Sequence, residues 1–449
     1  MSNDTTLFPM PKREVSETET RHHGTPRVKT ACRIQYEMQN TTLDELIDEN
    51  HQVRSVWAYV ESLDLSTIYQ TIQSVEGSAG RTAIDPKILL ALWLYATIEG
   101  IGSAYVLTRY CKEHNAFRWI CGGVDVERRT ITNFRVNQSE LFDTLLIQSV
   151  AVLINSGLVE LKEIAQDGVR VRAHAGSSSF RREKKLKMLL EIAQDRVKFL
   201  RKEIEEDPMA NSKRQQEAKK VAREDRKNRL EASLKELTAF RKQLNENRRK
   251  HRKALLTEDE IEETRVSTTD SKARIMKMGD GGFRPAYNVQ FATATFGQVI
   301  LGVDVVNVNS DAALLQPMFE KVKKLYSIPE RWLIDAGYKC KASITALSKE
   351  GCKVYTPVQS NPKAKQRRDL TKALPGEDKW LQEWRERMGT EDAKKIYKRR
   401  ASTAECVNAQ ARQRGLTQFL VRGLPKVTTV ATMYAIVHNM VRSIAHKLF

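Results

Sequence analysis

RWLIDAGY, residues 331–338, is a short apolar run that ends in an acid and turns at a glycine. This pattern predicts a buried strand with Asp335 at its carboxyl end. QDGVRVRA, residues 166–173, alternates apolar and polar residues and predicts a second strand, at the start of which lies Asp167. A third acid, Glu405, falls near the opening of a predicted helix. A carboxylate at the mouth of a sheet costs free energy unless a partner compensates for its desolvation.

A divalent cation is a suitable partner for such acids. Mg²⁺ prefers hard oxygen ligands and binds one or two carboxylates together with phosphate groups. Without metal, two carboxylates ~5 Å apart would repel by roughly 3 kcal/mol at an effective dielectric of ~20. Any one acid is more often a helix cap or a surface charge, so the argument depends on the three together. We expect Asp167, Asp335 and Glu405 to be catalytic metal ligands for Mg²⁺, or Mn²⁺, in phosphodiester chemistry.

The charge of the chain favours a polyanionic partner. Among 449 residues, Lys and Arg number 75 and Asp and Glu 56, so the formal net charge is +19. Nucleic acid is the commonest partner of such a protein, although a merely basic or ribosome-associated protein would have the same balance. The six cysteines form no C-x-x-C pair, which argues against a zinc ribbon or a disulfide framework and fits a reducing compartment. The longest apolar run, 88–96, is too short to span a bilayer, so we expect a soluble cytoplasmic protein.

Composition divides the chain into four parts. Residues 1–40 are polar and aperiodic and are expected to be mobile. Residues 41–158 show only helical patterns, in which Arg128, Arg129 and Arg135 either contact DNA through a helix-turn-helix or are the exposed arginines of an ordinary bundle. Residues 181–262 are about half charged and have apolar heptads on both sides of Asp207-Pro208. This pattern predicts an antiparallel helical hairpin. The hairpin would be a DNA clamp, a dimer arm or simply a solvated coiled coil.

The remaining residues, 159–180 and 263–449, predict an α/β domain. Strand patterns at 286–292, 299–306, 331–334 and 353–357 alternate with helical patterns at 312–326 and 341–351. Together with the strand that holds Asp167, this order suits a mixed sheet with helices packed against it. The first three strands would form a meander, and the last two would be reached by helical crossovers. Glu163 and Asp304 are expected to be outward-facing strand residues.

Four sequence blocks resemble bacterial insertion-sequence transposases of the DDE type. They are QDGVRVRA at 166–173, YNVQ at 287–290, LIDAGY at 333–338 and YKRRASTAE at 397–405. The last block, continued by RQRGL at 412–416 and HNMVR at 438–442, is similar to the subgroup with a Tyr-Arg-Glu-Lys signature. Arg412 stands where that subgroup has Lys, and Arg400 lies one residue farther from Glu405 than usual, so Arg399 remains a competitor for its place.

The resemblance implies an RNase H-like catalytic core and a DNA-binding and dimerising helical domain. It also implies cleavage at the ends of a mobile element, followed by attack of the new 3′-hydroxyl on target DNA, with Asp167, Asp335 and Glu405 as the acids. Tyr397, Arg400 and Arg412 would position DNA. The expected partners are double-stranded DNA and further copies of the chain, in the nucleoid of a bacterial cytoplasm. Two alternatives remain open: a nuclease of the same fold that never joins strands, and a non-catalytic DNA-binding protein derived from a transposase.

Overall fold

The structure is a computed structural model that describes residues 41–74, 82–206, 212–250, 252–358 and 371–446. The chain divides into two units, Met1–Thr42 and Leu43–Phe449, and every element below belongs to the second. The polar segment 1–40 and the predicted break at Asp207-Pro208 lie outside the described residues.

The described part of residues 52–155 forms helices, as predicted. In α3 the Asp85 side chain accepts a hydrogen bond from the Lys87 amide at 2.8 Å, and Pro86 occupies the first turn. This helix is buried on nearly all sides, which explains why its sequence is apolar without a periodic stripe. The helices are α1 (Gln52–Ser62), α2 (Ser66–Tyr69), α3 (Pro86–Ile98), α4 (Ala104–Glu113), α5 (Asn115–Cys121), α6 (Arg128–Asn137) and α7 (Ser139–Asn155).

The described residues also form a six-stranded mixed sheet. Its central strand β1 pairs antiparallel with β5 and parallel with β7, and β7 pairs parallel with β8. Both β4 and β6 pair antiparallel with β5. The strands are β1 (Glu163–Arg172), β4 (Arg274–Lys277), β5 (Phe283–Ala294), β6 (Ile300–Val306), β7 (Arg331–Ile334) and β8 (Lys353–Tyr355). The predicted meander is thus β1–β5–β6, whereas β4 was not predicted.

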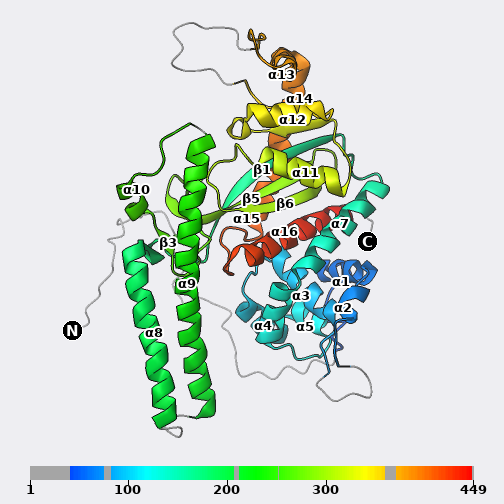
Figure 1. Ribbon diagram of the computed structural model, residues 1–449. Coiled ribbons are helices and arrows are strands. Elements are labelled where there is room, and N and C mark those ends of the chain that lie inside the picture. Colours follow the sequence, from blue (N-terminus) through cyan, green and yellow to red (C-terminus); the bar gives the residue numbers. More distant parts are fainter. Residues whose placement is uncertain (1–40, 75–81, 207–211, 251, 359–370, 447–449) are drawn as a thin grey trace, which may run out of the picture. The chain divides into compact units, whose positions relative to one another are not determined.

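Helical crossovers lead to the two parallel strands, as expected. Helix α11 (Leu315–Leu325) precedes β7 and packs on β6, and α12 (Lys341–Lys349) precedes β8. The chain continues through α13 (Lys379–Gly389), α14 (Glu391–Arg400), a π-helical turn η3 (Ala401–Glu405) and α15 (Cys406–Gln413). The last helix, α16 (Leu424–Ala445), contacts β6 as well as α3 and α7, so it lies between the sheet and the helical block (Figure 1).

Helix α16 is attached to the sheet by polar side chains as well as by apolar packing. The Asn439 side chain donates to the Ile300 carbonyl and accepts from the Ile300 amide, both at 2.9 Å. His438 Nε2 lies 2.6 Å from the Gln298 carbonyl oxygen. Burial is the main cause that lowers the pKa of His438 to about 4. The ring is therefore neutral near pH 7 and donates its Nε2 hydrogen to this carbonyl.

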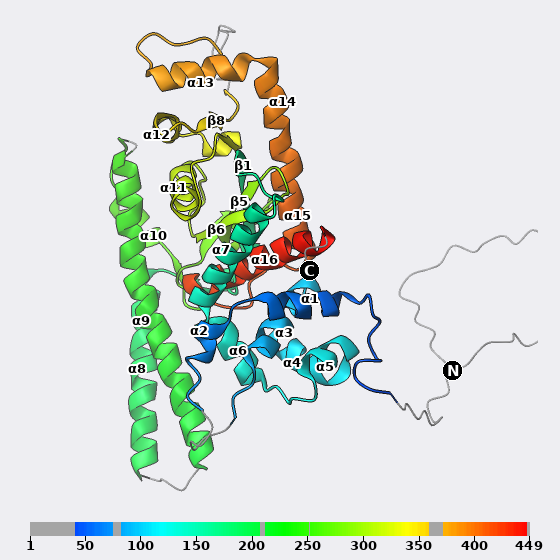
Figure 2. The same ribbon diagram turned by 90° about the vertical axis from the view of Figure 1, so that its right-hand side faces the viewer.

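The charged region forms the predicted antiparallel hairpin, in which α8 (Glu183–Glu206) lies beside the longer α9 (Lys213–Lys250), which extends beyond it (Figures 1 and 2). Apolar side chains of both helices, including Leu186 and Leu237, make a small core of their own. At its base, Arg274 of β4 pairs with the buried Glu236 at 2.5 Å. Nearby lie α10 (Glu258–Glu263), the turn η1 (Ser177–Ser179) and the two-stranded sheet of β2 (Phe180–Arg181) and β3 (Val266–Ser267).

None of the helices in the described parts of the chain is both long enough and apolar enough to cross a membrane.

Candidate active site

Asp167 and Asp335 lie at the same edge of the sheet. The parallel pairing of β1 with β7 ends at Gln166 and Ile334, and each aspartate is the next residue along its strand. Asp335 is exposed, and its side chain accepts a hydrogen bond from the Ala336 amide at 2.5 Å, at the start of the 3₁₀ turn η2 (Ala336–Tyr338). Two segments far apart in sequence therefore bring their acids to one place.

The Asp167 carboxylate is partly buried and has three partners. It accepts from the Gly168 amide at 2.9 Å and from the Asn408 side chain of α15 at 3.1 Å, and it lies 3.8 Å from Nη1 of Arg400. Burial raises the pKa of Asp167, the Gly168 amide and Arg400 oppose this rise, and Asp335 and Asp311 add to it. The negative charge at Asp167 thus costs free energy that a further cation would reduce.

Glu405 joins the same group through Arg400. Its side chain is 66% exposed, and its Oε1 lies 3.6 Å from Nη2 of Arg400. In a regular α-helix two residues five positions apart point about 140° away from each other around the axis. Here the π turn η3 spans the interval, and its i→i+5 bonding brings such residues to one face. The additional residue between Arg400 and Glu405 is thereby accommodated.

The structure distinguishes the two neighbouring arginines. Arg399 donates to Glu163 at 2.7 and 2.6 Å, whereas Arg400 is the one that faces Asp167 and Glu405. Glu163 is 5% exposed and also pairs with Arg331 at 3.4 Å, so the expectation that it faces outward was wrong. The burial of Glu163 could not be predicted, because its partner Arg399 lies 236 residues away and such an ion pair leaves no pattern in the sequence around Glu163.

A buried polar network lies beside Asp167, and the sequence did not reveal its role. Both oxygen and nitrogen of the Gln290 side chain are occupied: the oxygen accepts from Gln166 and Tyr338, and the nitrogen donates to Asn288 and Asp311. Asp311 is the acid whose charge also acts on Asp167. The available signal was YNVQ at 287–290, where polar residues alternate within a strand that is otherwise apolar.

The three acids do not form a ready-made metal cluster. Within the parts of the chain that the structure describes, no three His, Cys, Asp or Glu side chains are grouped closely enough to hold one ion. The Arg400 guanidinium instead lies between Asp167 and Glu405. The donor set consists of carboxylate oxygens, the ligands that Mg²⁺ and Mn²⁺ prefer. Burial is the main cause that raises the pKa of Asp167, and a bound cation would offset this cost of its negative charge. The residues therefore suit a hard divalent ion in their chemistry.

The other predicted DNA-binding residues have different surroundings. Tyr397 is half-buried, and its ring lies 5.8 Å from the Arg400 guanidinium. Arg412 is exposed at the end of α15, and Arg128 and Arg129 are exposed at the start of α6.

Arg135 is the exception, because it is part of the core. It is 6% exposed, its guanidinium lies 4.0 Å from the centre of the Trp93 ring, and it donates to the Gly102 carbonyl at 2.8 Å. Burial lowers its pKa to about 10. In this position the Arg135 side chain is enclosed by the helical core, where it contacts Trp93 and Gly102. The basic spacing of α6 could not distinguish its buried arginine from its exposed ones.

Comparison with protein families identifies both ends of the described chain. Residues 331–444 match a family described as transposase DDE domain, and residues 41–137 match one described as transposase domain (DUF772). Asp335 and Glu405 fall inside the first match, while Asp167 and the charged hairpin fall outside both. Searches of curated proteins and of solved structures gave no match. The chain thus carries the two domains of an insertion-sequence DDE transposase.

Proposed function

We propose that this transposase cleaves the ends of its element and joins the resulting 3′-hydroxyl to target DNA, with Asp167, Asp335 and Glu405 as its catalytic acids. The observation that supports the proposal is the neighbouring position of Asp167 and Asp335 at the end of the β1–β7 pairing, together with the contacts of Arg400 to Asp167 and Glu405. Asp167 lies within β1 and Asp335 directly follows β7, each one residue beyond the last paired residues of these parallel strands, and Arg400 contacts both Asp167 and Glu405.

The strand order supports assignment of the catalytic domain to the RNase H-like fold. The order β6–β5–β1–β7–β8 combines an antiparallel meander with two parallel strands reached by helical crossovers. The first acid then lies on the central strand and the second at the end of its parallel neighbour. This is the arrangement expected from the resemblance to DDE transposases.

The three carboxylates would hold Mg²⁺ or Mn²⁺. When bound, the metal supplies Lewis-acid activation of the attacking oxygen and stabilises charge on the leaving oxygen. Asn408 and the Gly168 amide hold the Asp167 carboxylate in place through hydrogen bonds at 3.1 and 2.9 Å. Arg400 balances part of the charge of Asp167 and Glu405. Because its guanidinium and a metal ion would compete for the same carboxylate oxygens, Arg400 would be free to contact a DNA phosphate when metal is bound.

Other exposed groups would guide the DNA. Tyr397 stands beside Arg400 and would contact the terminal nucleotide, and Arg412 would contact a phosphate. Arg128 and Arg129 are exposed in the segment that matches the DUF772 transposase domain, so they are candidates for contacts with the element end. Because two ends must be processed together, we expect a homodimer or a larger assembly on DNA.

Strand cleavage tests the assignment of Asp335. The Asp335→Asn variant should lose cleavage of a plasmid carrying both element ends in Mg²⁺, and should bind an end duplex as tightly as the unmodified protein. Asp392→Asn is the matched control, because Asp392 is an exposed acid of α14 paired only loosely with Lys395, at 3.8 Å. Cleavage by Asp335→Asn at the rate of the control would show that the assignment is wrong.

A second assay separates transposition from simple nuclease action. Protein, Mg²⁺, a pre-cleaved end with a free 3′-hydroxyl and a supercoiled target plasmid are incubated together. A transposase yields a covalent product in which the labelled end is joined to the plasmid, and the same product should be missing with Asp335→Asn. If the unmodified protein nicks the target but joins no end, strand transfer is not its function.

A further inference from the structure

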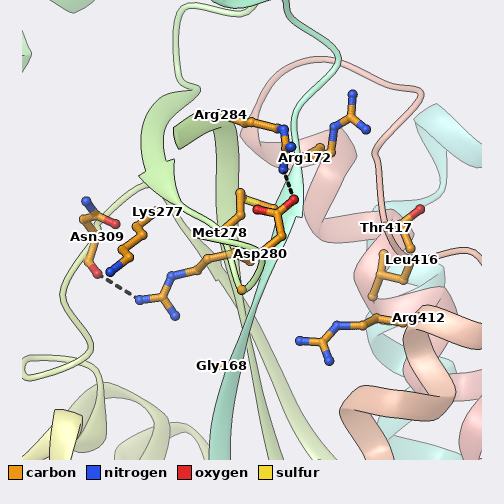
Figure 3. Close-up of a pocket in the computed structure, with 12 residues that line it drawn as sticks. Gly168, Arg172, Lys277, Met278, Asp280, Arg284, Asn309, Arg412, Leu416 and Thr417 are labelled. Atoms are coloured by element: carbon orange, nitrogen blue, oxygen red, sulfur yellow. Dashed lines mark hydrogen bonds and ion pairs between the residues drawn. The ribbon is translucent and has the colours of Figure 1, made fainter. Parts of the chain in front are cut away.

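A strongly basic pocket lies along β1, immediately next to the candidate active site. Its volume is about 920 Å³, and Gly168, the neighbour of Asp167, contributes to its wall. Figure 3 shows Arg412 extending toward β1 from one side and Lys277 on the opposite side, beside Asn309. The charged side chains in its wall come from four elements and the loop between β4 and β5: Arg170, Arg172, Lys277, Asp280, Arg284 and Arg412.

Two of the five cations in this wall are already neutralised. Arg284 forms an ion pair with Asp280 (Figure 3). Arg170 pairs with Asp311 at 2.9 Å and donates to the Asn309 carbonyl at the same distance.

The other three cations, Arg172, Lys277 and Arg412, are exposed, and no ion pair to any of them is found within the residues that the structure describes. They come from positions 105 and 135 residues apart, so their gathering is a product of the fold. Three like charges around one pocket repel one another, and an anion bound among them would relieve that repulsion.

The edge of β1 connects this pocket with the acids. β7 covers that edge only as far as Gln166, and the next pairing on the same side that the described residues make is the isolated bridge of Arg172 with Gln418. Asp167 and Gly168 lie in the interval between these two pairings. A polymer that occupied the pocket would therefore run along β1 directly into the site of the acids.

The volume limits what can enter. It corresponds to a cube roughly 10 Å on a side, smaller than the ~12 Å width of one B-DNA major groove, so only part of a duplex can lie inside it. A short stretch of one sugar–phosphate backbone is of suitable size. Its phosphates could serve as ion-pair partners for Arg172, Lys277 and Arg412.

We infer that this basic pocket binds the phosphodiester backbone of the one DNA strand that enters the active site, with Arg172, Lys277 and Arg412 each facing a phosphate. The inference rests on the proposed function for the identity of the strand. It adds two residues, Arg172 and Lys277, that no family signature assigns, and it gives the strand a direction along β1 away from Asp167.

Salt-dependent DNA binding in EDTA tests this inference without any need for catalysis. The probe is a fluorescent duplex with the terminal sequence that flanks the reading frame and with several unpaired nucleotides on the strand that would enter the pocket, measured between 50 and 250 mM NaCl with the full-length chain. Each lost phosphate contact should reduce the slope of log K against log[salt] by about 0.9 for a duplex or about 0.7 for a separated strand. Lys277→Ala and Arg172→Ala should each show this change with several-fold weaker binding, and the double variant should show about twice the change.

Lys324→Ala is the control, because Lys324 is an exposed lysine of α11 that does not line the pocket. It removes the same charge and should leave the slope unchanged. Equal slopes for the double variant and this control would overturn the inference. That outcome is distinct from failure of the proposed function, which would appear as cleavage by Asp335→Asn and does not depend on the pocket.

Discussion

Replacing Gly168 by alanine would place a methyl group inside the hydrogen-bonded network beside Asp167. A Cβ atom at this position would lie 2.3 Å from Nε2 of Gln290, 2.8 Å from Oδ1 of Asn288 and 3.1 Å from the Tyr338 hydroxyl. Contacts of this kind require at least one of the three side chains to move. The glycine is therefore needed for space.

The size of the effect follows from what Gln290 would lose. Gln290 is 1% exposed, and its amide has partners on both the oxygen and the nitrogen, so it has no free direction in which to withdraw. Overpacking a core costs about 1–3 kcal/mol. Loss of one buried hydrogen bond adds about 1 kcal/mol. We expect Gly168→Ala to lower the free energy of unfolding by about 2–4 kcal/mol.

Urea denaturation followed by circular dichroism measures this loss, with Gly176→Ala as the matched control. Gly176 has an ordinary φ of −85°, and its added Cβ would come no closer than 3.5 Å to the Ser178 hydroxyl. The control should change the free energy of unfolding by less than about 0.5 kcal/mol. If Gly168→Ala unfolds at the same urea concentration as the control, the packing argument for this position is refuted.

Three further results are expected. The pKa of the buried His438 is about 4, whereas a histidine of the unfolded chain has a pKa of about 6.5, so protons bind the unfolded chain preferentially between these values. The contribution of His438 to the free energy of unfolding should be complete above about pH 6.5 and fall by up to ~3 kcal/mol toward pH 4. Urea titrations of His438→Gln at pH 7 and pH 4 should lack this part of the loss. Deletion of Ser402 should convert the π turn into regular α-helix and leave the melting temperature unchanged. Deletion of Ala409, in the regular helix α15, should lower the melting temperature by many degrees, because it rotates the residues after it by about 100° around the helix axis. Arg135→Ala should destabilise the protein by about 2–4 kcal/mol, because it leaves a cavity over Trp93, and its DNA-binding salt slope should equal that of the unmodified chain.

Local pattern was sufficient for elements whose residues follow a clear period. The apolar run at 331–334 and the alternation at 166–173 both correspond to strands, and the heptads of the charged region correspond to α8 and α9. Strand β4 was missed because its four residues, RIMK, are too few to establish a period. The position of Asp335 directly after its strand was predicted correctly, whereas Asp167, expected at the start of a strand, lies in the middle of β1 because the strand already begins at Glu163.

Contacts between distant segments decided the rest. The alternation of polar and apolar residues records which side of a strand faces the core, and it was enough to predict the mixed sheet and the helical blocks. It does not record which guanidinium reaches which carboxylate. The choice of Arg400 over Arg399, the close approach of Gln290 to Gly168 and the gathering of cations beside β1 depend on side chains that meet across 100 residues or more of chain or across a π turn. The burial of Arg135 depends on Trp93 and Gly102, which lie 42 and 33 residues before it. Such meetings depend on packing and on charge at distances of a few ångströms, and only the folded chain determines those distances.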